Sequence, residues 1–286
     1  MREVIVVAGP TSSGKSDFAV ELAHTMNGEI ISADSRQIYK GLDLGTGKIT
    51  HTEMKGVPHH MLDIKNPGEP FSVSEYKRIA LPILEDILAR GRTPIICGGT
   101  GQYIDALIYK QELPKVPPNE RLRKELSYLT TPDLVEKLRK LDEESLATID
   151  SHNRVRLIRA IEIAMSFGKV PKLETPKLRY KTTMYILLPK REVLRDRIIK
   201  RLHKRFDEGM VKEVEKLISN GMTYEECERL GLEYRYISRY LRGLLSKEEM
   251  TRELEFKCNQ YAKRQLTWLK KYEKDKDLNV WITEIK

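Results

Sequence analysis

Cysteine is scarce in this sequence of 286 residues, and the spacings that would give it a structural role are absent. The three cysteines, Cys97, Cys227 and Cys258, lie far apart and form no CxxC pair, which argues against a disulfide framework and a sequence-local zinc site. We interpret each as a small buried residue. The adjacent histidines His59 and His60 lack a third ligand at a suitable spacing, so we expect loop structure there instead of a metal site.

Long apolar runs are also missing from the sequence. None approaches the roughly 18 residues needed to span a bilayer. The run from Met1 to Ala8 leads directly into a strand-like segment without a cleavable signal pattern. We therefore expect a cytoplasmic protein without a membrane partner, and we take it to be a monomer.

Basic residues outnumber acidic residues in the later part of the chain, whereas they do not in the first part. Residues 1–112 carry 12 Lys and Arg against 14 Asp and Glu, a net charge of −2, whereas residues 113–286 carry 39 against 28, a net charge of +11. A solvated basic surface explains part of this excess, so charge alone does not establish nucleic-acid binding. The asymmetry favours chemistry near the start of the chain and a polyanion held by the rest.

The first predicted elements follow the order strand, loop, helix. Residues 3–9 read as a buried strand that runs into a glycine-rich loop, and an amphipathic helix then continues to Met26. Further strands are expected at 29–32, which leads to Asp34, and at 94–97, which leads to a Gly-Gly-Thr-Gly turn containing Thr100. Alternating strands and helices imply a parallel sheet with ligands outside the carboxyl ends of its strands, so Asp34 and Thr100 should lie beside the loop.

The glycine-rich loop fits the phosphate-binding pattern G-x-x-x-x-G-K-[ST] in full, between a predicted strand and a predicted helix. In that pattern the backbone N–H groups cradle phosphates at a helix N-terminus, the lysine adds a positive charge, and the last hydroxyl ligates Mg²⁺. We therefore expect Mg²⁺ as a cofactor, with Ser16 as its ligand. The loop consists of Gly9, Pro10, Thr11, Ser12, Ser13, Gly14, Lys15 and Ser16.

The ligand of this loop need not be ATP. A nucleoside-triphosphate hydrolase usually carries an acidic residue after a second apolar strand to hold Mg²⁺. Here the strand at 94–97 ends in Cys97-Gly98-Gly99-Thr100 instead. The loop is thus suited to a diphosphate that leaves intact.

We expect an α/β fold in which a P-loop NTPase-like parallel sheet, flanked by helices, carries an inserted all-helical subdomain. Strand-like runs disappear in residues 114–180, where charged helical segments are predicted at 120–129 and 133–141. A strand returns at 183–188. The core therefore comprises residues 1–113 and 181–286.

A long helix is predicted to begin near Arg191. Its apolar stripe recurs every fourth residue, and Arg197, Arg201 and Arg205 occupy its flank at the same spacing. Another amphipathic helix is expected at about 247–274, followed by a short strand at 279–282. The stripe consists of Leu194, Ile198, Leu202, Phe206, Met210 and Val214.

Asp34 is the best candidate for a catalytic base, because it ends a strand beside the phosphate loop. A helix cap or a role behind a Mg²⁺ ligand would also suit its position. The neighbouring Ser35 and Gln37 offer donors and acceptors suited to the edge of a nucleobase. Thr100 sits on a turn that permits close approach of the backbone to a ligand.

These segments resemble the bacterial tRNA dimethylallyltransferases, also called tRNA isopentenyltransferases, over nearly the whole chain. The order and spacing of the matching blocks are highly specific, although Leu230-Gly231-Leu232-Glu233-Tyr234 departs from the usual Ile-Gly-Tyr block of the family. The matching blocks are 9–16, Asp34-Ser35-Arg36-Gln37-Ile38-Tyr39, Pro58-His59-His60 with Asp63, 98–101, Asn153-Arg154 with Arg159-Ala160, and 261–265 with Thr267-Trp268.

The resemblance implies transfer of the dimethylallyl group of dimethylallyl diphosphate to the exocyclic N6 amine of the adenosine just 3′ of the anticodon. Asp34 would then accept the amine proton, and Thr100 would orient the amine or Asp34. Lys15, Mg²⁺ on Ser16 and the Arg201–Arg205 face would stabilise the departing diphosphate, with Arg205 as the favoured catalytic arginine.

A tRNA anticodon stem-loop is the macromolecular partner that the resemblance implies. Its base must be splayed out before the amine reaches a buried carboxylate. The inserted helices and the basic C-terminal half would hold the stem by its phosphates. The candidate tRNA-binding residues are Asp34, Ser35, Arg36, Gln37, Thr100, Arg123, Arg159, Lys263 and Arg264.

Three other functions compete with this one. A P-loop small-molecule kinase would use Asp34 to activate a hydroxyl, but the missing acidic residue after the strand at 94–97 opposes it. An adenylate isopentenyltransferase would share the motifs with a free nucleotide as acceptor, and the basic later part of the chain argues for a polymer instead. A nucleotide-dependent RNA-binding protein would leave Asp34 and Thr100 without a role.

Overall fold

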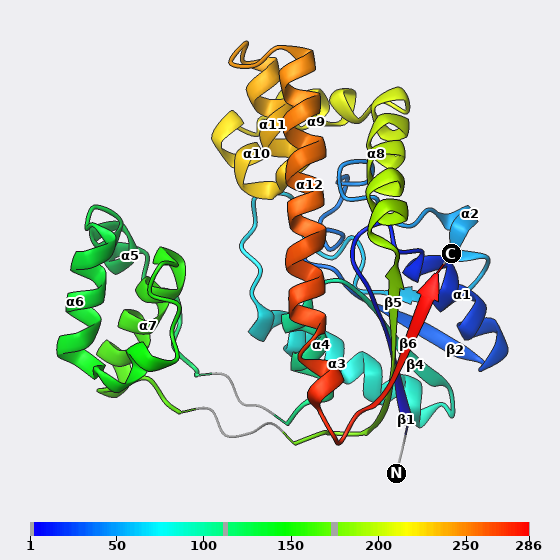
Figure 1. Cartoon of the computed structure of the whole chain (residues 1–286), viewed down its shortest axis with the longest axis horizontal. Helices are drawn as coiled ribbons and strands as arrows, with labels where there is room; N and C mark the ends of the chain where they lie inside the picture. Colours follow the sequence, from blue (N-terminus) through cyan, green and yellow to red (C-terminus); the bar gives the residue numbers. More distant parts are fainter. Residues whose placement is uncertain (1–2, 111–113, 173–176, 286) are drawn as a thin grey trace. The chain divides into compact units, whose positions relative to one another are not determined.

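The chain forms two compact units, one built around a parallel sheet and one made of helices (Figure 1). The structure is a computed structural model that describes residues 3–110, 114–172 and 177–285. The sheet unit comprises Met1–Lys110 and Leu178–Lys286, and the helical unit comprises Gln111–Lys177. The sequence places this insertion at 114–180.

Six strands form the sheet, and every neighbouring pair is parallel, which confirms the predicted sheet type. Their spatial order is β3-β2-β4-β1-β5-β6. The loop expected at His59 and His60 is wrong, because these two residues pair with β2 as the short strand β3. The strands are β1 (Glu3–Ala8), β2 (Gly28–Ala33), β3 (His59–His60), β4 (Thr93–Gly98), β5 (Lys181–Pro189) and β6 (Asn279–Ile285).

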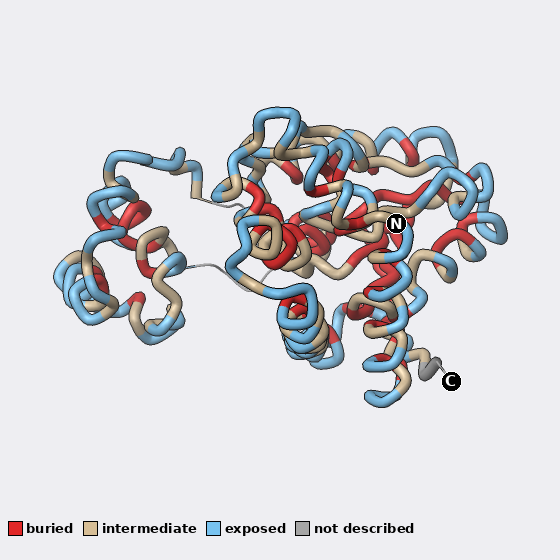
Figure 2. The backbone as a smooth tube through the Cα atoms, turned by 90° about the horizontal axis from the view of Figure 1, so that it is seen from above, coloured by how far each residue is buried: buried red, intermediate tan, exposed pale blue. Residues whose placement is uncertain are grey.

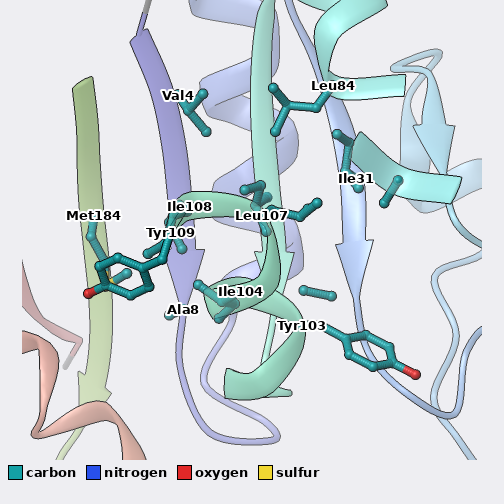
Figure 3. Close-up of a cluster of buried hydrophobic side chains, with 14 of the residues drawn as sticks. Val4, Ala8, Ile31, Leu84, Tyr103, Ile104, Leu107, Ile108, Tyr109 and Met184 are labelled. Atoms are coloured by element: carbon teal, nitrogen blue, oxygen red, sulfur yellow. The ribbon is translucent and has the colours of Figure 1, made fainter. Parts of the chain in front are cut away.

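Helices cover both faces of the sheet because successive apolar side chains of its buried strands point to opposite faces. In β1, Val4 and Val6 pack beneath α3 (Val73–Ala89) and α4 (Gly101–Ile108), whereas Ile5 and Val7 pack against α1 (Lys15–Thr25) on the opposite face. Figure 3 shows α4 laid against the strands, with Ile104, Leu107 and Ile108 directed into this core. Both faces of the sheet are thereby buried.

The loops that carry the predicted site leave one edge of the sheet together. Ala8 at the end of β1 and Ala33 at the end of β2 are both in register with Gly98 of β4. A Cβ atom on Gly98 would lie 2.2 Å from the carbonyl oxygen of Ala33, so this close approach requires glycine. The phosphate loop, Asp34 and the Thr100 turn are consequently neighbours.

The helix predicted from Arg191 is wrong in one respect, because the structure divides it in two. Helix α8 (Arg191–Asp207) ends before Gly209, whose φ of +100° suits glycine, and α9 (Met210–Ser219) begins after it. The apolar stripe continues across the break and serves two cores. Leu194 and Ile198 pack against α12 (Lys247–Leu269), whereas Leu202, Met210 and Val214 belong to another cluster.

The remaining elements of the sheet unit are short, except for α12, which lies beside α8 (Figure 1). Helix α12 ends five residues before the predicted end of 274. Within the described residues no helix combines the length and apolarity that crossing a membrane demands. The other short elements are α2 (His51–Met54), α10 (Tyr224–Leu230), α11 (Leu232–Leu241) and η2 (Tyr272–Lys274).

The helical unit has its own small core. Leu134 and Leu138 of one helix pack against Leu157 and Ile161 of another, and all four are fully buried. Figure 2 shows buried stretches, coloured red, within the helices of this unit. The helices are α5 (Glu120–Ser127), α6 (Thr131–Asp142), η1 (Glu144–Ala147) and α7 (Arg154–Phe167).

Candidate functional site

A cavity of about 330 Å³ opens at the carboxyl ends of the strands in the sheet unit. The phosphate loop, the segment after β2, α8, α11 and α12 contribute its walls. The structure therefore gathers most of the predicted site residues into one place. Those that line the cavity are Thr11, Lys15, Ser16, Asp34, Ser35, Arg36, Gln37, Arg201, Arg205 and Arg264.

The phosphate loop is shaped to receive an anion. Its turn passes through Ser12, with φ of +62°, and Gly14, with φ of +85°, directly before α1. The buried hydroxyls of Ser12 and Ser13 have no hydrogen-bond partner among the described residues. A buried hydroxyl without a partner is costly, so these groups favour a ligand that accepts hydrogen bonds. A Cβ atom on Gly9 would lie 2.5 Å from Ser13 Oγ, which explains the first glycine of the motif.

Lys15, Arg201 and Arg205 are among the cations that line the cavity. Burial lowers the pKa of Lys15, and the nearby guanidinium groups of Arg201 and Arg205 lower it further. Burial, followed by repulsion from Arg205, lowers the pKa of Arg201 to about 10. Both shifts mean that the positive charges are short of compensation, since burial and like charges each disfavour the charged form. An anion with several charges would relieve this arrangement.

Arg205 is buried against a glycine of the loop that follows β2. Gly47 has φ of +61°, and a Cβ atom there would collide with the guanidinium group of Arg205. The carbonyl oxygen of Gly47 accepts a hydrogen bond from Gln37 Nε2 at 3.2 Å. On another side, Glu233 Oε1 lies 3.8 Å from Arg205 Nη1. These contacts fix the guanidinium group at the cavity wall.

The loop at 43–48 is itself anchored by a single carboxylate that the sequence did not reveal. Glu213 of α9 accepts hydrogen bonds from the backbone N–H groups of Asp43, Leu44 and Gly45 at 2.7–3.0 Å, and from the hydroxyl of Tyr234 at 2.7 Å. Because Gly47 follows directly, Glu213 positions the segment that packs on Arg205.

The two carboxylate oxygens of Asp34 differ in their contacts. Its Oδ1 accepts hydrogen bonds from the backbone N–H groups of Arg36, at 2.8 Å, and Gln37, at 3.4 Å. No donor among the described residues contacts Oδ2. Thr100 Oγ1 accepts a hydrogen bond from the N–H of Ser35 at 3.1 Å, so Thr100 holds the segment that carries Asp34. Thr100 does not line the cavity itself.

Gln265 of α12 joins two of the loops and had no predicted role. Its Oε1 accepts a hydrogen bond from Thr11 N–H at 2.8 Å, and its Nε2 donates to the carbonyl oxygen of Gly99 at 3.2 Å. Thr11 Oγ1 in turn accepts a hydrogen bond from Arg201 Nη2. The sequence pointed to Gln265 only through its place in the block 261–265, which resembles the family but does not indicate a chemical function for this residue.

Besides Thr100, three predicted tRNA-binding residues do not line the cavity. In the helical unit, Arg123 Nε lies 2.7 Å and Arg159 Nη1 lies 2.9 Å from the buried carboxylate of Glu162. These ion pairs give both arginines a structural role within their unit. Lys263 is exposed on α12. The contacts of all three with tRNA stay predictions.

His60 is engaged with a carboxylate. Its Nε2 lies 2.8 Å from Glu29 Oε2, and Glu29 also binds Arg90 and Arg92. Among residues 3–110, 114–172 and 177–285 no three His, Cys, Asp or Glu side chains lie close enough together to hold a metal. Such a cluster is not needed for Mg²⁺, which is commonly held by one or two protein oxygens together with substrate phosphates. The hydroxyl of Ser16 at the cavity suits that kind of site.

Comparison with known protein families and curated proteins identifies close relatives of this chain. The family model described as IPP transferase matches residues 37–272, and that described as isopentenyl transferase matches residues 2–67. A tRNA dimethylallyltransferase of Geotalea uraniireducens is 40% identical over 98% of this chain and 92% of its own length. One from Geobacillus thermodenitrificans is 41% identical over 94% of this chain and 87% of its length.

Solved structures agree with these sequence matches. A tRNA isopentenylpyrophosphate transferase from Bacillus halodurans superimposes with a TM-score of 0.71 at 35% identity, covering 99% of this chain and 91% of that one. A eukaryotic dimethylallyltransferase described as acting on tRNA gives a TM-score of 0.82 at 26% identity, covering 99% of this chain and 74% of that one. The structural comparison and the sequence comparison therefore point to the same family.

Proposed function

This chain belongs to the IPP transferase family of prenyltransferases, and from that premise we propose that it joins a dimethylallyl group to the N6 amine of the adenosine 3′-adjacent to the anticodon of tRNA. The donor is dimethylallyl diphosphate. One observation carries the proposal: the carboxylate of Asp34 and the cations Lys15, Arg201 and Arg205 line the same cavity. A base and a diphosphate site are thereby adjacent.

In the proposed reaction the allylic C–O bond breaks, and its electron pair leaves with the diphosphate. The lone pair of N6 forms the new C–N bond, and the N6 proton passes to Asp34 Oδ2, which has no other donor among the described residues. Lys15, Arg201 and Arg205 stabilise the negative charge that develops on the diphosphate. Thr100 acts as a positioning residue through the N–H of Ser35.

We propose Mg²⁺ as the cofactor of this reaction, with Ser16 as its protein ligand. Mg²⁺ supplies charge neutralisation of the diphosphate when it is bound. The unpartnered hydroxyls of Ser12 and Ser13 support an anion at the same loop. We further propose that the enzyme works as a cytoplasmic monomer.

The proposed acceptor is the anticodon stem-loop of tRNA, with its target base splayed into the cavity. Arg36 and Arg264 line the cavity and are exposed, so their guanidinium planes are available to a base or a phosphate. Arg264 also lies over the ring of Tyr261, with its Cζ atom 5.7 Å from the ring centroid. This arginine and tyrosine offer a stacking surface in place of the stack that the base leaves.

Mass spectrometry of a digest of bulk tRNA tests the proposal. The protein, Mg²⁺ and dimethylallyl diphosphate are incubated with tRNA that lacks the modification, and one adenosine per acceptor tRNA should gain a dimethylallyl group. A parallel reaction with adenosine monophosphate tests the free-nucleotide acceptor, and a reaction with labelled ATP tests phosphoryl transfer. Modified mononucleotide with unmodified tRNA, or labelled phosphate on a small molecule, would overturn it.

A further inference from the structure

One acidic side chain in the cavity has no part in the proposed chemistry. Glu233 of α11 lines the cavity, and its side chain is 20% exposed. Asp34 is the other acidic residue among the described cavity-lining residues, and it serves as the base. Glu233 therefore needs a separate explanation, because placing a carboxylate where a diphosphate must bind works against anion binding.

Glu233 contacts Arg205, one cation of the diphosphate site, and interacts electrostatically with another, Arg201. Its Oε1 lies 3.8 Å from Arg205 Nη1, and Cys258 Sγ donates a weak hydrogen bond to the same oxygen at 3.9 Å. Burial raises the pKa of Glu233, whereas Arg205 and Arg201 oppose that rise. The carboxylate thus lies in a poorly solvated position whose main compensation is the arginine pair.

We propose that Glu233 is an internal counter-anion of the diphosphate site, which partly compensates the charge of Arg201 and Arg205 before the ligand binds and competes with diphosphate for them afterwards. The inference rests on the proposed function, since it takes diphosphate as the ligand. Glu233 limits the effect of the mutual repulsion of Arg201 and Arg205 in the free protein. It also weakens retention of diphosphate after transfer and so promotes product release.

The test is calorimetric titration of the full-length protein with inorganic diphosphate in the presence of Mg²⁺. In Glu233→Gln the shape of the side chain stays and its charge disappears. We expect diphosphate to bind about tenfold more tightly, the scale expected for removing one unit charge several ångströms from a multivalent anion in a partly buried site. Product inhibition by diphosphate should strengthen in the same proportion.

Two matched variants separate the effect of the Glu233 charge from the effects of side-chain shape and of position in the protein. Glu233→Asp retains the charge and should bind diphosphate within about twofold of the wild type. Glu228→Gln loses the same charge at a residue that pairs with Arg239 and does not line the cavity, so its affinity should be unchanged. Weaker or equal diphosphate binding in Glu233→Gln would overturn the inference.

Thermal unfolding keeps the test decisive if the variant is less stable. Diphosphate should raise the Tm of Glu233→Gln by more than it raises that of the wild type, because the carboxylate that competes with diphosphate for the arginines has lost its charge. A diphosphate-induced rise no larger than that of the wild type would contradict the inference. Failure of the proposed function is scored separately, by dimethylallyl transfer to tRNA, which these titrations do not involve.

Discussion

Two pairs of arginines in this protein have opposite electrostatic surroundings. Arg123 and Arg159 in the helical unit share the buried carboxylate of Glu162 at 2.7–2.9 Å. In the cavity, Glu233 lies 3.8 Å from Arg205, and burial followed by repulsion from Arg205 lowers the pKa of Arg201 to about 10. The first pair is compensated within the fold, whereas the second requires an external anion.

This difference shows why residue counts alone mislead. The helical unit, residues 111–177, carries 13 Lys and Arg against 11 Asp and Glu, a net charge of +2, whereas residues 178–286 carry 26 against 18, a net charge of +8. Most of the excess positive charge therefore belongs to the sheet unit. The comparison predicts that cavity variants lose activity while folded and that helical-unit variants lose stability first.

The largest expected effect is at the base. We expect Asp34→Ala to lower turnover by roughly 10²–10⁴-fold, the range for loss of a general base, while tRNA binding and folding persist. Single-turnover transfer of dimethylallyl to tRNA measures the loss, and filter binding of tRNA is the control. Turnover near that of the wild type would remove Asp34 from the chemistry.

Next in size is the loss of a cavity arginine. Arg205→Ala should lower turnover by about 10²–10³-fold, because a preorganised charge that stabilises the leaving group disappears. The matched variant Arg123→Ala removes an arginine that is paired with a carboxylate, that of Glu162, within the fold. Any activity that it loses should follow the folded fraction measured by circular dichroism. Equal losses of turnover per folded molecule would erase the distinction between the two pairs.

The sequence was sufficient to predict the site residues that belong to a local motif or directly follow a predicted strand. The phosphate loop between β1 and α1 combines a motif with its flanking elements, and Asp34 follows a strand whose neighbours are also predicted, so both could be placed before the structure was known. The helix break at Gly209 escaped prediction because the apolar spacing continues across it.

Long-range contacts were beyond sequence reasoning. Gln265 meets Thr11 across 254 positions of sequence, and Glu213 meets Gly45 across 168, so no local pattern announces either contact. Arg159 and Glu162 are one helical turn apart, yet Arg123 joins them from 39 positions away. A single sequence shows charge and spacing, but the fold decides which charges are compensated.

In the helical unit the expected effect is on stability. Glu162→Gln leaves Arg123 and Arg159 without their shared carboxylate, which should cost about 1–3 kcal/mol, below the usual value for breaking a buried pair because both arginines are partly exposed. Hydrogen exchange of amides in α5 and α7 of the full chain measures this cost. Diphosphate affinity should stay at the wild-type value, and unchanged exchange protection would contradict the structural role.

The same carboxylate predicts a pH dependence. Burial opposes ionisation of Glu162, but hydrogen bonds from Arg123, the N–H of Asn119 and Arg159 outweigh it and lower its pKa to about 2. A lowered pKa in the folded state means that the stabilisation is complete above the unfolded value of about 4.3 and is lost as pH falls toward 2. Amide protection in α5 and α7 should decline across that window in the wild type. Glu162→Gln should lack this component of the decline.

The smallest expected effect concerns the exposed charges of α12, which belong to neither arginine pair. Arg264 lines the cavity, and Lys263 beside it is exposed, so both are available to phosphates of the anticodon stem. Each phosphate contact contributes about −0.7 to −0.9 to the slope of log affinity against log salt. Alanine at both positions should therefore make the slope of tRNA binding shallower by about 1.4–1.8 if each makes one contact.

The paired arginines provide the control for this measurement. If Arg123 is occupied by Glu162, then Arg123→Ala at a temperature where the helical unit stays folded should leave the salt slope almost unchanged. Inorganic diphosphate affinity reports whether the cavity is intact in every variant. A shallower slope in Arg123→Ala, with none in the Lys263 and Arg264 double variant, would assign the phosphate contacts to the helical unit. In that case a tRNA phosphate would replace Glu162 as the partner of Arg123. An ion pair within the fold would then no longer distinguish structural arginines from arginines that bind tRNA.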